Sequence, residues 1–264
     1  VLGVTDLPGS LARPLPRAAR LSVRELGSES LPERTVLVWM DWFSALYDEA
    51  TQSDVLRGLT ALGYAPRFVE MLPAGKVAGD LGDAAGFRAM ADRLSAALRK
   101  GAATGAPMIG LDPAFVMALR QDYRKAGLDA PALLLPQEFL ASELRSGVRL
   151  PQAQGGGLSL FTHCTESTAA PAALKDWQAV FAGICLEIET PATGCCGMAG
   201  VFGHKDRHQE MSRKLFDLSW AGPVAGAEEA AATGFSCRCQ SERLGGKALR
   251  HPLGLIADRL DAPA

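Results

Sequence analysis

Short apolar runs alternate with longer amphipathic stretches from residue 35 onward, and this alternation restricts the fold more than any other feature. Val36 to Met40 is an apolar run bounded by polar residues, which predicts a buried strand. Residues 84–99 carry apolar side chains at helical spacing, which predicts an amphipathic helix. Further strands are expected at 67–71, 107–110, 133–135, 158–161, 184–188 and 229–233, and helices at 51–63, 113–126, 137–144, 172–183, 205–220, from Cys237 and at 253–260. This order predicts an α/β fold with parallel sheets flanked by helices.

The chain is expected to have three parts. Residues 1–34 are polar, rich in arginine and interrupted by prolines, which predicts an N-terminal tether. The glycine-rich stretch from Gln152 to Gly157 is the best internal linker, and the strand–helix order restarts after it. We therefore expect a first lobe at 35–150 and a second lobe at 151–264.

The two lobes resemble copies of each other. A shift of 121 residues places Gly79 on Gly200 and Gly82 on Gly203. At that shift, or at 122, the positions of Cys164, Cys195, Cys196 and Cys237 correspond to Phe43, Ala74, Gly75 and Phe115. Chance agreement among common residues is the alternative. We favour an internal duplication that gives two pseudo-symmetric lobes, of which the first has no cysteine ligands.

Composition excludes several classes of protein. With 27 basic and 29 acidic residues the chain has no strongly basic field, so nucleic-acid binding is not expected. No apolar run reaches the length of a membrane span, so no transmembrane segment is expected. Six cysteines in 264 residues are too few for a disulfide scaffold. The expected setting is therefore a reducing cytoplasm, where clustered thiols hold metal or do redox work. Because the chain begins with Val1, we expect a piece of a longer polypeptide.

All six cysteines and all four histidines lie beyond residue 150, and four of the cysteines follow predicted strands. They are Cys164, the adjacent Cys195 and Cys196, and Cys237. Ligands of an open parallel sheet collect at the carboxyl ends of its strands, so these loops could converge on one point. Cys237 is expected to open a helix, whose N-terminus favours the thiolate that binds iron or zinc. The sequence thus predicts a four-thiolate metal site; zinc, a redox-active Cys195–Cys196 disulfide and buried structural thiols are the alternatives.

Other cysteines and histidines have simpler interpretations. Cys185 lies in a predicted strand and is expected in the core, whereas Cys239 is expected to be a bystander near the site or an extra ligand. His163 could donate a hydrogen bond to sulfur or bind the metal directly. His204 and His208, four residues apart, are expected on a solvated helix start.

Three segments carry a resemblance to a known family: His163-Cys164, Gly194-Cys195-Cys196-Gly197-Met198-Ala199-Gly200, and Thr233-Gly234-Phe235-Ser236-Cys237-Arg238. They resemble the cysteine-rich CCG domain family, which includes the B subunit of heterodisulfide reductase and the iron–sulfur subunit of glycolate oxidase. The string CCGMAGVFGH, the later SCRCQ and the closing Arg250-His251-Pro252 look closest to the C-terminal parts of FAD-linked D-2-hydroxy-acid dehydrogenases, of the D-2-hydroxyglutarate or D-lactate type.

The resemblance implies a duplicated CCG-type module that binds an iron–sulfur cluster, [4Fe–4S], through Cys164, Cys195, Cys196 and Cys237. In the family a fifth cysteine stands where this chain has Gln240, which favours four ligands. The module would relay electrons from FAD to an unknown electron acceptor, with the FAD and a ferredoxin-like domain lying upstream in the same polypeptide. This implies part of an oxidoreductase whose isolated chain has no turnover, in the cytoplasm or peripheral to the inner membrane. A zinc-stabilised docking domain and a thiol–disulfide redox protein are the rival hypotheses.

Overall fold

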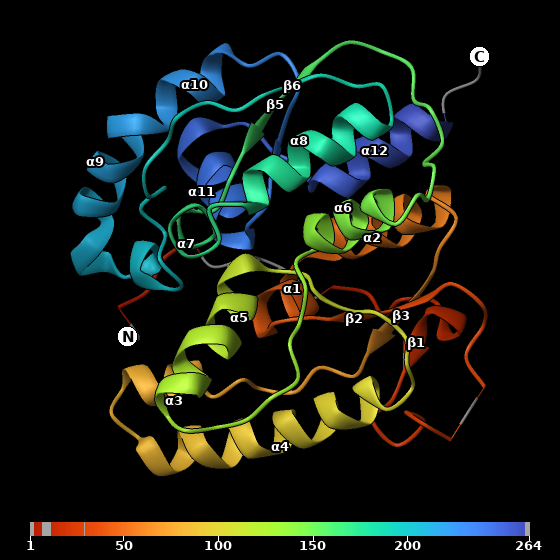
Figure 1. Cartoon of the computed structure of the whole chain (residues 1–264). Helices are drawn as coiled ribbons and strands as arrows, with labels where there is room; N and C mark the ends of the chain where they lie inside the picture. Colours follow the sequence, from red (N-terminus) through yellow and green to blue (C-terminus); the bar gives the residue numbers. More distant parts are fainter. Residues whose placement is uncertain (1–2, 7–11, 29, 262–264) are drawn as a thin grey trace.

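The strands form two parallel sheets, each flanked by helices (Figure 1). The computed structural model describes residues 3–6, 12–28 and 30–261. The first sheet has the order β1-β3-β2-β4, with β1 at Arg20–Leu21, β2 at Thr35–Trp39, β3 at Ala65–Val69 and β4 at Met108–Gly110. The second has the order β6-β5-β7, with β5 at Leu158–Phe161, β6 at Ile188–Glu189 and β7 at Ala230–Ala232. The predicted α/β class with parallel sheets is confirmed.

Helices cover the sheets, and every residue of β2 and of β5 is buried, as a strand covered on both faces requires. The helices are α1 (Trp42–Tyr47), α2 (Glu49–Ala61), α3 (Lys76–Asp80), α4 (Ala84–Ala102), α5 (Pro113–Ala118), α6 (Pro136–Arg145), α7 (Cys164–Ala169), α8 (Ala173–Gly183), α9 (Gln209–Ser219), α10 (Ala221–Gly226), α11 (Phe235–Gly245) and α12 (Pro252–Asp261). A π-turn at Leu119–Tyr123 extends α5, and 3₁₀ turns lie at Arg17–Ala19, Phe202–His204 and Asp206–His208. Among the described residues, no helix combines the length and the apolarity needed to cross a membrane.

The two sheets have the same register. Leu37 of β2 pairs with Met108 of β4, and Ser159 of β5 pairs with Ala230 of β7, so equivalent positions lie 122 residues apart. The same offset relates the partners of these strands in β3 and β6. One further parallel bridge extends each sheet beyond its last strand, at Leu134 and at Arg250. The boundaries 1–34, 35–150 and 151–264 stay a prediction, and we call residues 30–150 and 151–261 the first and second halves.

The register changes the predicted correspondence between the cysteines and positions of the first half. With an offset of 122, the positions of Cys164, Cys195, Cys196 and Cys237 correspond to Trp42, Pro73, Ala74 and Phe115, so Trp42 replaces Phe43 and the two intermediate positions each move back by one residue. Gly75 and Gly197, which this offset relates, both have a left-handed backbone, with φ of 80° and 87°. The offset of 121 was based on glycines that follow this loop. There the two halves differ in structure, because the first half forms α3 and the second forms a 3₁₀ turn.

Four helices join the halves: α2 packs on α12, and α6 packs on α8 (Figure 1). Glycine permits the first contact, because a Cβ on Gly58 would lie 2.3 Å from the carbonyl oxygen of Leu253. Arg250 forms an ion pair across the same interface with Asp54. The buried Arg238 of α11 forms a second ion pair with Asp48 of the first half, at 2.6 Å. The halves therefore share one packed interface.

Two predicted strands and one predicted core residue were wrong. Leu133 to Leu135 forms a single bridge rather than a strand, and β6 contains only the last residue of the predicted 184–188 strand. Cys185 is exposed rather than in the core, because it follows the C-terminus of α8 in a left-handed conformation with φ of 62°. The predicted tether contributes β1 to the first sheet, since Leu21 is buried there; residues 1–2, 7–11 and 29 lie outside the described residues.

Candidate functional site

The four predicted ligand cysteines lie at the carboxyl edge of the second sheet. Cys164 is the first residue of α7, which follows β5, and Cys237 is the third residue of α11, which follows β7. Cys195 and Cys196 lie in the loop after β6. Cys196 and Cys237 are buried, and Cys164 and Cys195 are half-buried. The structure thus brings together the four residues from three separate loops, and Cys237 lies in the first turn of a helix, as expected.

The four thiols contact one another in a row. The thiol of Cys164 interacts with that of Cys195, Cys195 with Cys196, and Cys196 with Cys237. As the side chains stand, no group of three or more His, Cys, Asp or Glu residues within 3–6, 12–28 and 30–261 could hold a metal ion. Proximity of the thiols is therefore observed, whereas ligation of a metal stays a prediction.

The thiols of this row shift one another's pKa in opposite directions. Interactions with the thiols of Cys164 and Cys196 hold the pKa of Cys195 well below its usual range, and the backbone N–H of Gly197 donates a hydrogen bond to its sulfur at 3.4 Å. Interactions with Cys195 raise the pKa of Cys164 and of Cys196, the thiol of Cys237 raises that of Cys196 as well, and burial raises both further. Cys195 is therefore the thiol of the row whose deprotonation is most favoured, and both metal binding and oxidation require a deprotonated thiol.

The backbone of the vicinal pair depends on glycine. A Cβ on Gly197 would lie 2.3 Å from the carbonyl oxygen of Ser212 in α9, so the loop lies directly against that helix. Gly200 is also left-handed, with φ of 64°. Phe161 and Met198 are buried in one cluster with Cys196 and Cys237. Phe235 instead stacks on Phe43, and Phe202 stacks on His208, so these two rings face other neighbours.

His163 positions a helix, and both of its ring nitrogens have protein partners. It is buried and is the N-cap of α7, where its Nδ1 accepts the N–H of Thr165 at 3.1 Å. An accepting Nδ1 leaves the ring proton on Nε2, which lies 3.2 Å from the hydroxyl of Ser236. The His163 ring thus connects the first turn of α7 to the first turn of α11, rather than pointing a free nitrogen at the thiols.

Two buried carboxylates near the site were missed by the sequence analysis. Glu166 accepts hydrogen bonds from the hydroxyl of Thr233 and the amide of Gln137, and burial raises its pKa to about 7. Asp112, from the first half, accepts the backbone N–H of Phe235 at 2.9 Å and so reaches the helix that carries Cys237. An aspartate before a proline indicates a local N-cap, but nothing in the sequence indicates a bond between residues so far apart.

The remaining candidates lie beside the thiol row. Cys239 contacts Nε2 of His204 at 3.9 Å, and burial raises the pKa of its thiol to about 11. Gln240, at the place of the fifth cysteine, is buried and donates to the hydroxyl of Ser212 at 2.8 Å. His204 is buried rather than solvated, because its ring also contacts a backbone carbonyl of the N-terminal segment. His208 is partly exposed and lies in a 3₁₀ turn before α9.

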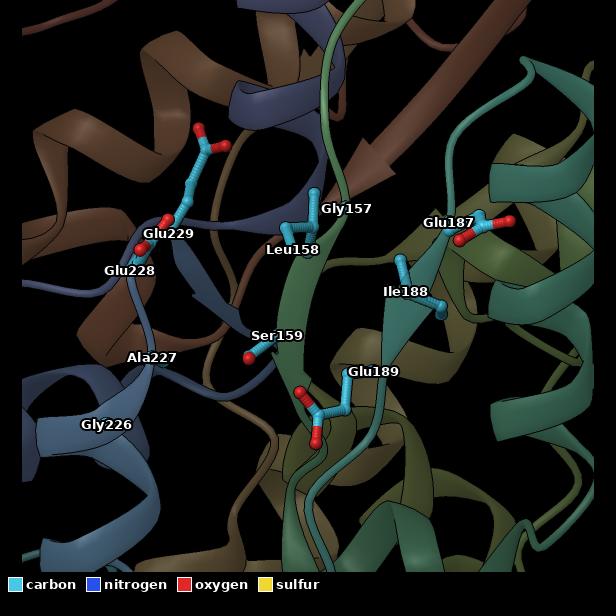
Figure 2. Close-up of a pocket in the computed structure, with 10 residues that line it drawn as sticks. All are labelled: Gly157, Leu158, Ser159, Glu187, Ile188, Glu189, Gly226, Ala227, Glu228 and Glu229. Atoms are coloured by element: carbon cyan, nitrogen blue, oxygen red, sulfur yellow. The ribbon is translucent and has the colours of Figure 1, made fainter.

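A cavity of about 420 Å³ lies at the opposite, amino edge of the second sheet (Figure 2). Figure 2 shows it between the start of β5, the residues around β6 and the segment before β7, with carboxylates from Glu187, Glu189, Glu228 and Glu229. Glu229 is paired with Arg259. Ligands of parallel sheets collect at the carboxyl edge, so the thiols, and not this cavity, form the candidate site.

Comparisons with known proteins connect the chain to one group of enzymes. It is 37% identical over 237 residues to D-2-hydroxyglutarate dehydrogenase of Pseudomonas putida (89% of this chain, 23% of the relative). It is 36% identical over 272 residues to D-2-hydroxyglutarate dehydrogenase of Escherichia coli (97% of this chain, 26% of the relative). An aspartate racemase homologue of Pyrococcus horikoshii OT3 matches at 13% identity with a TM-score of 0.30, covering 84% of this chain and 96% of that one, a likeness too low to support an argument.

No protein-family model matches the chain, so the CCG assignment stays a prediction. The dehydrogenases are similar to nearly all of this chain, and the chain spans about a quarter of their length. The chain is therefore similar to one segment of the D-2-hydroxyglutarate dehydrogenases.

Proposed function

We propose that this chain is the iron–sulfur electron-transfer module, and the C-terminal part, of an FAD-linked D-2-hydroxy-acid dehydrogenase of the D-2-hydroxyglutarate type. The observation that carries the proposal is the row of four thiols from three loops at the carboxyl edge of one sheet. Similarity to D-2-hydroxyglutarate dehydrogenases over nearly the whole chain supports the enzyme class. FAD, a ferredoxin-like domain and substrate oxidation belong, in this proposal, to the rest of a longer polypeptide.

The residues fit a four-thiolate group in their chemistry. Four cysteines are the ligand set of a [4Fe–4S] cluster, and each thiolate binds a separate iron, so the sulfurs surround the cluster rather than one central ion. The partners Phe161 and Met198 supply an apolar wall beside Cys196 and Cys237. The position of a fifth cysteine is closed, because Gln240 is bonded to α9. Such a cluster, when bound, accepts and releases one electron at a time.

The residues of the chain hold and shield the site. Cys196 and Cys237 are buried and would bind on the protein side, whereas the half-buried Cys164 and Cys195 lie where the site approaches solvent. His163 fixes the first turns of α7 and α11 relative to each other through Thr165 and Ser236. The site contains thiols and a histidine whose nitrogens are both engaged, so we propose that the isolated chain oxidises no 2-hydroxy acid.

Anaerobic reconstitution with iron and sulfide tests the proposal. We expect a brown protein with a broad band near ~400 nm and about four irons per chain, as a four-thiolate cluster requires. Cys196→Ser should abolish the colour, and Cys185→Ser is the matched control because Cys185 is exposed and lies outside the thiol row. Colourless protein with one tightly held zinc would favour the zinc-stabilised docking domain.

A thiol–disulfide function is the second candidate, because Cys195 and Cys196 are adjacent free cysteines and the half-buried Cys195 lies where the site approaches solvent. It predicts reduction of a small disulfide substrate by metal-free protein, lost in Cys195→Ser. If the metal-free chain shows this turnover and takes up no iron, the electron-relay proposal is wrong.

A further inference from the structure

We propose that Asp112, a residue of the half without cysteine ligands, is a positioning residue for the thiol site: its carboxylate fixes the first turn of α11, and with it Cys237, and places a negative charge beside that turn. The positioning role rests on the contacts described below. The effect of the charge on a bound cluster rests, in addition, on the proposed function.

The N-terminus of α11 has no side chain of its own that could cap it. Its N-cap residue is Gly234, and a Cβ at this position would lie 2.3 Å from Cδ2 of His163, so a larger residue would have to displace the imidazole ring. The first N–H groups of a helix need acceptors from elsewhere when the N-cap cannot supply one. Asp112 supplies it, because its Oδ2 accepts the N–H of Phe235 at 2.9 Å.

Asp112 is itself held in place. Its side chain is buried, and its other oxygen, Oδ1, accepts the N–H of Ala114 at 2.8 Å as the N-cap of α5. One carboxylate therefore joins the N-termini of two helices, one in each half. The ring of Phe43 stacks on that of Phe235 at 5.5 Å, so the first half contacts the same turn of α11 through a second residue.

Cys237 lies two residues after Phe235 and is buried against Cys196. A shift of the first turn of α11 would therefore alter the contact between these two thiols. The charge of Asp112 acts in the same place: a helix N-terminus favours negative groups, and a carboxylate already bound there offsets that attraction. Asp112 should thus disfavour the added negative charge of a reduced cluster and lower its reduction potential.

The test compares three variants of the whole chain. Asp112→Ala removes both the hydrogen-bond acceptor and the charge, whereas Asp112→Asn removes the charge and leaves one acceptor oxygen. Asp83→Asn is the matched control, because Asp83 caps α4 through the N–H of Gly86 at 2.8 Å and is exposed. Two quantities are measured: amide hydrogen exchange across residues 235–240 in the reduced, metal-free chain, and the midpoint potential of the reconstituted chain.

We expect exchange across residues 235–240 to accelerate about five-fold in Asp112→Ala, less in Asp112→Asn and not at all in Asp83→Asn. We expect the midpoint potential to move to a more positive value in Asp112→Asn and to stay unchanged in Asp83→Asn. Unaltered exchange in Asp112→Ala would refute the positioning role. An unaltered potential in Asp112→Asn would refute the effect of the charge. If the unmodified chain takes up no iron, the proposed function fails, and the exchange comparison still decides the positioning role.

Discussion

The two halves have the same strand register, and they differ in the turns that follow the strands. After β2 the first half has Asp41 as the N-cap of α1, and after β5 the second half has His163 as the N-cap of α7. After β4 the first half has Asp112, where the second half has Gly234 after β7. The side chains that form the thiol row in one half are thus replaced by aromatic and aliphatic residues in the other.

This difference shows how one scaffold can serve two purposes. Phe115, at the position of Cys237, is buried in the core of the first half, whereas Trp42, at the position of Cys164, is half exposed. The carboxylates of Asp41 and Asp112 lie at the carboxyl edge of the first sheet, and Asp112 accepts a hydrogen bond from α11 of the second half. The first half therefore has no thiol row, but its Asp112 supports the helix that carries Cys237 in the second half.

The largest effect is expected at the two equivalent left-handed glycines. Gly197→Ala should lower the free energy of unfolding by about 3–4 kcal/mol, since the added Cβ meets a backbone oxygen of α9 and the residue has positive φ. Gly75→Ala should cost somewhat less, about 2–3 kcal/mol, because the nearest backbone atom, the oxygen of Phe87, lies at 2.8 Å rather than 2.3 Å. Urea unfolding measures both. A change at only one glycine would show that the loops of the two halves are not equivalent.

Gly234→Ala tests the position where the halves differ most. The φ of Gly234 is −99°, which alanine adopts without strain, so only the contact with the His163 ring opposes the substitution. We expect a loss of about 2–3 kcal/mol in the free energy of unfolding, with displacement of the ring. The displacement would be visible as a changed histidine signal in NMR. Gly156→Ala, which meets no atom within 4 Å, is the control. Equal stability of both variants would contradict the described packing of His163.

The first half should also carry a pH dependence through Asp41. Its Oδ2 is buried without a hydrogen-bond partner, and burial, followed by the charge of Asp112, raises the pKa of Asp41 to about 6. The protonated form is then favoured in the folded state, so the stabilising contribution is present below the unfolded pKa near 3.8 and is lost as the pH rises through about 6. The free energy of unfolding should therefore fall as the pH rises, and in Asp41→Asn it should fall by about 1–2 kcal/mol less. Urea unfolding between pH 4 and 7 measures it, and an unchanged slope in the variant would exclude Asp41 as its source.

The sequence predicted those parts of the fold that depend on continuous apolar runs. The apolar run at 158–161 predicted β5, and the alternation of strands and helices around it predicted parallel neighbours. Because three loops follow strands of this sheet, the sequence also predicted that their four thiols would lie at one edge. β1 could not be found, because two residues that pair with β3 leave no periodicity in an arginine-rich stretch. The predicted strand at 184–188 failed because its first residues complete the end of α8.

The supporting residues of the site were harder to predict than the thiols. Asp112 bonds across 123 residues of sequence to Phe235, and Glu166 is buried by contacts with Thr233, which follows β7, and with Gln137 of α6. A single sequence records such side chains only as local features: an aspartate before a proline, or a glutamate in the first turn of a helix. The identity of ligands follows from residue type, whereas the residues that orient them depend on packing between the halves.

The smallest predicted effect uses the same offset at the ends of α2 and α8. Gly63 and Cys185 are equivalent, both follow a helix C-terminus, and both have positive φ, 85° and 62°. Glycine adopts this conformation without the strain that a cysteine side chain brings, although it loses more chain entropy on folding. Cys185→Gly should therefore raise the free energy of unfolding by about 0.5–1 kcal/mol, and Gly63→Ala should lower it by about 1 kcal/mol. Thermal unfolding of both variants measures the pair. If Cys185→Gly were instead destabilising, Cys185 would have contacts that offset its strained backbone, and the two helix ends would not be equivalent in energy.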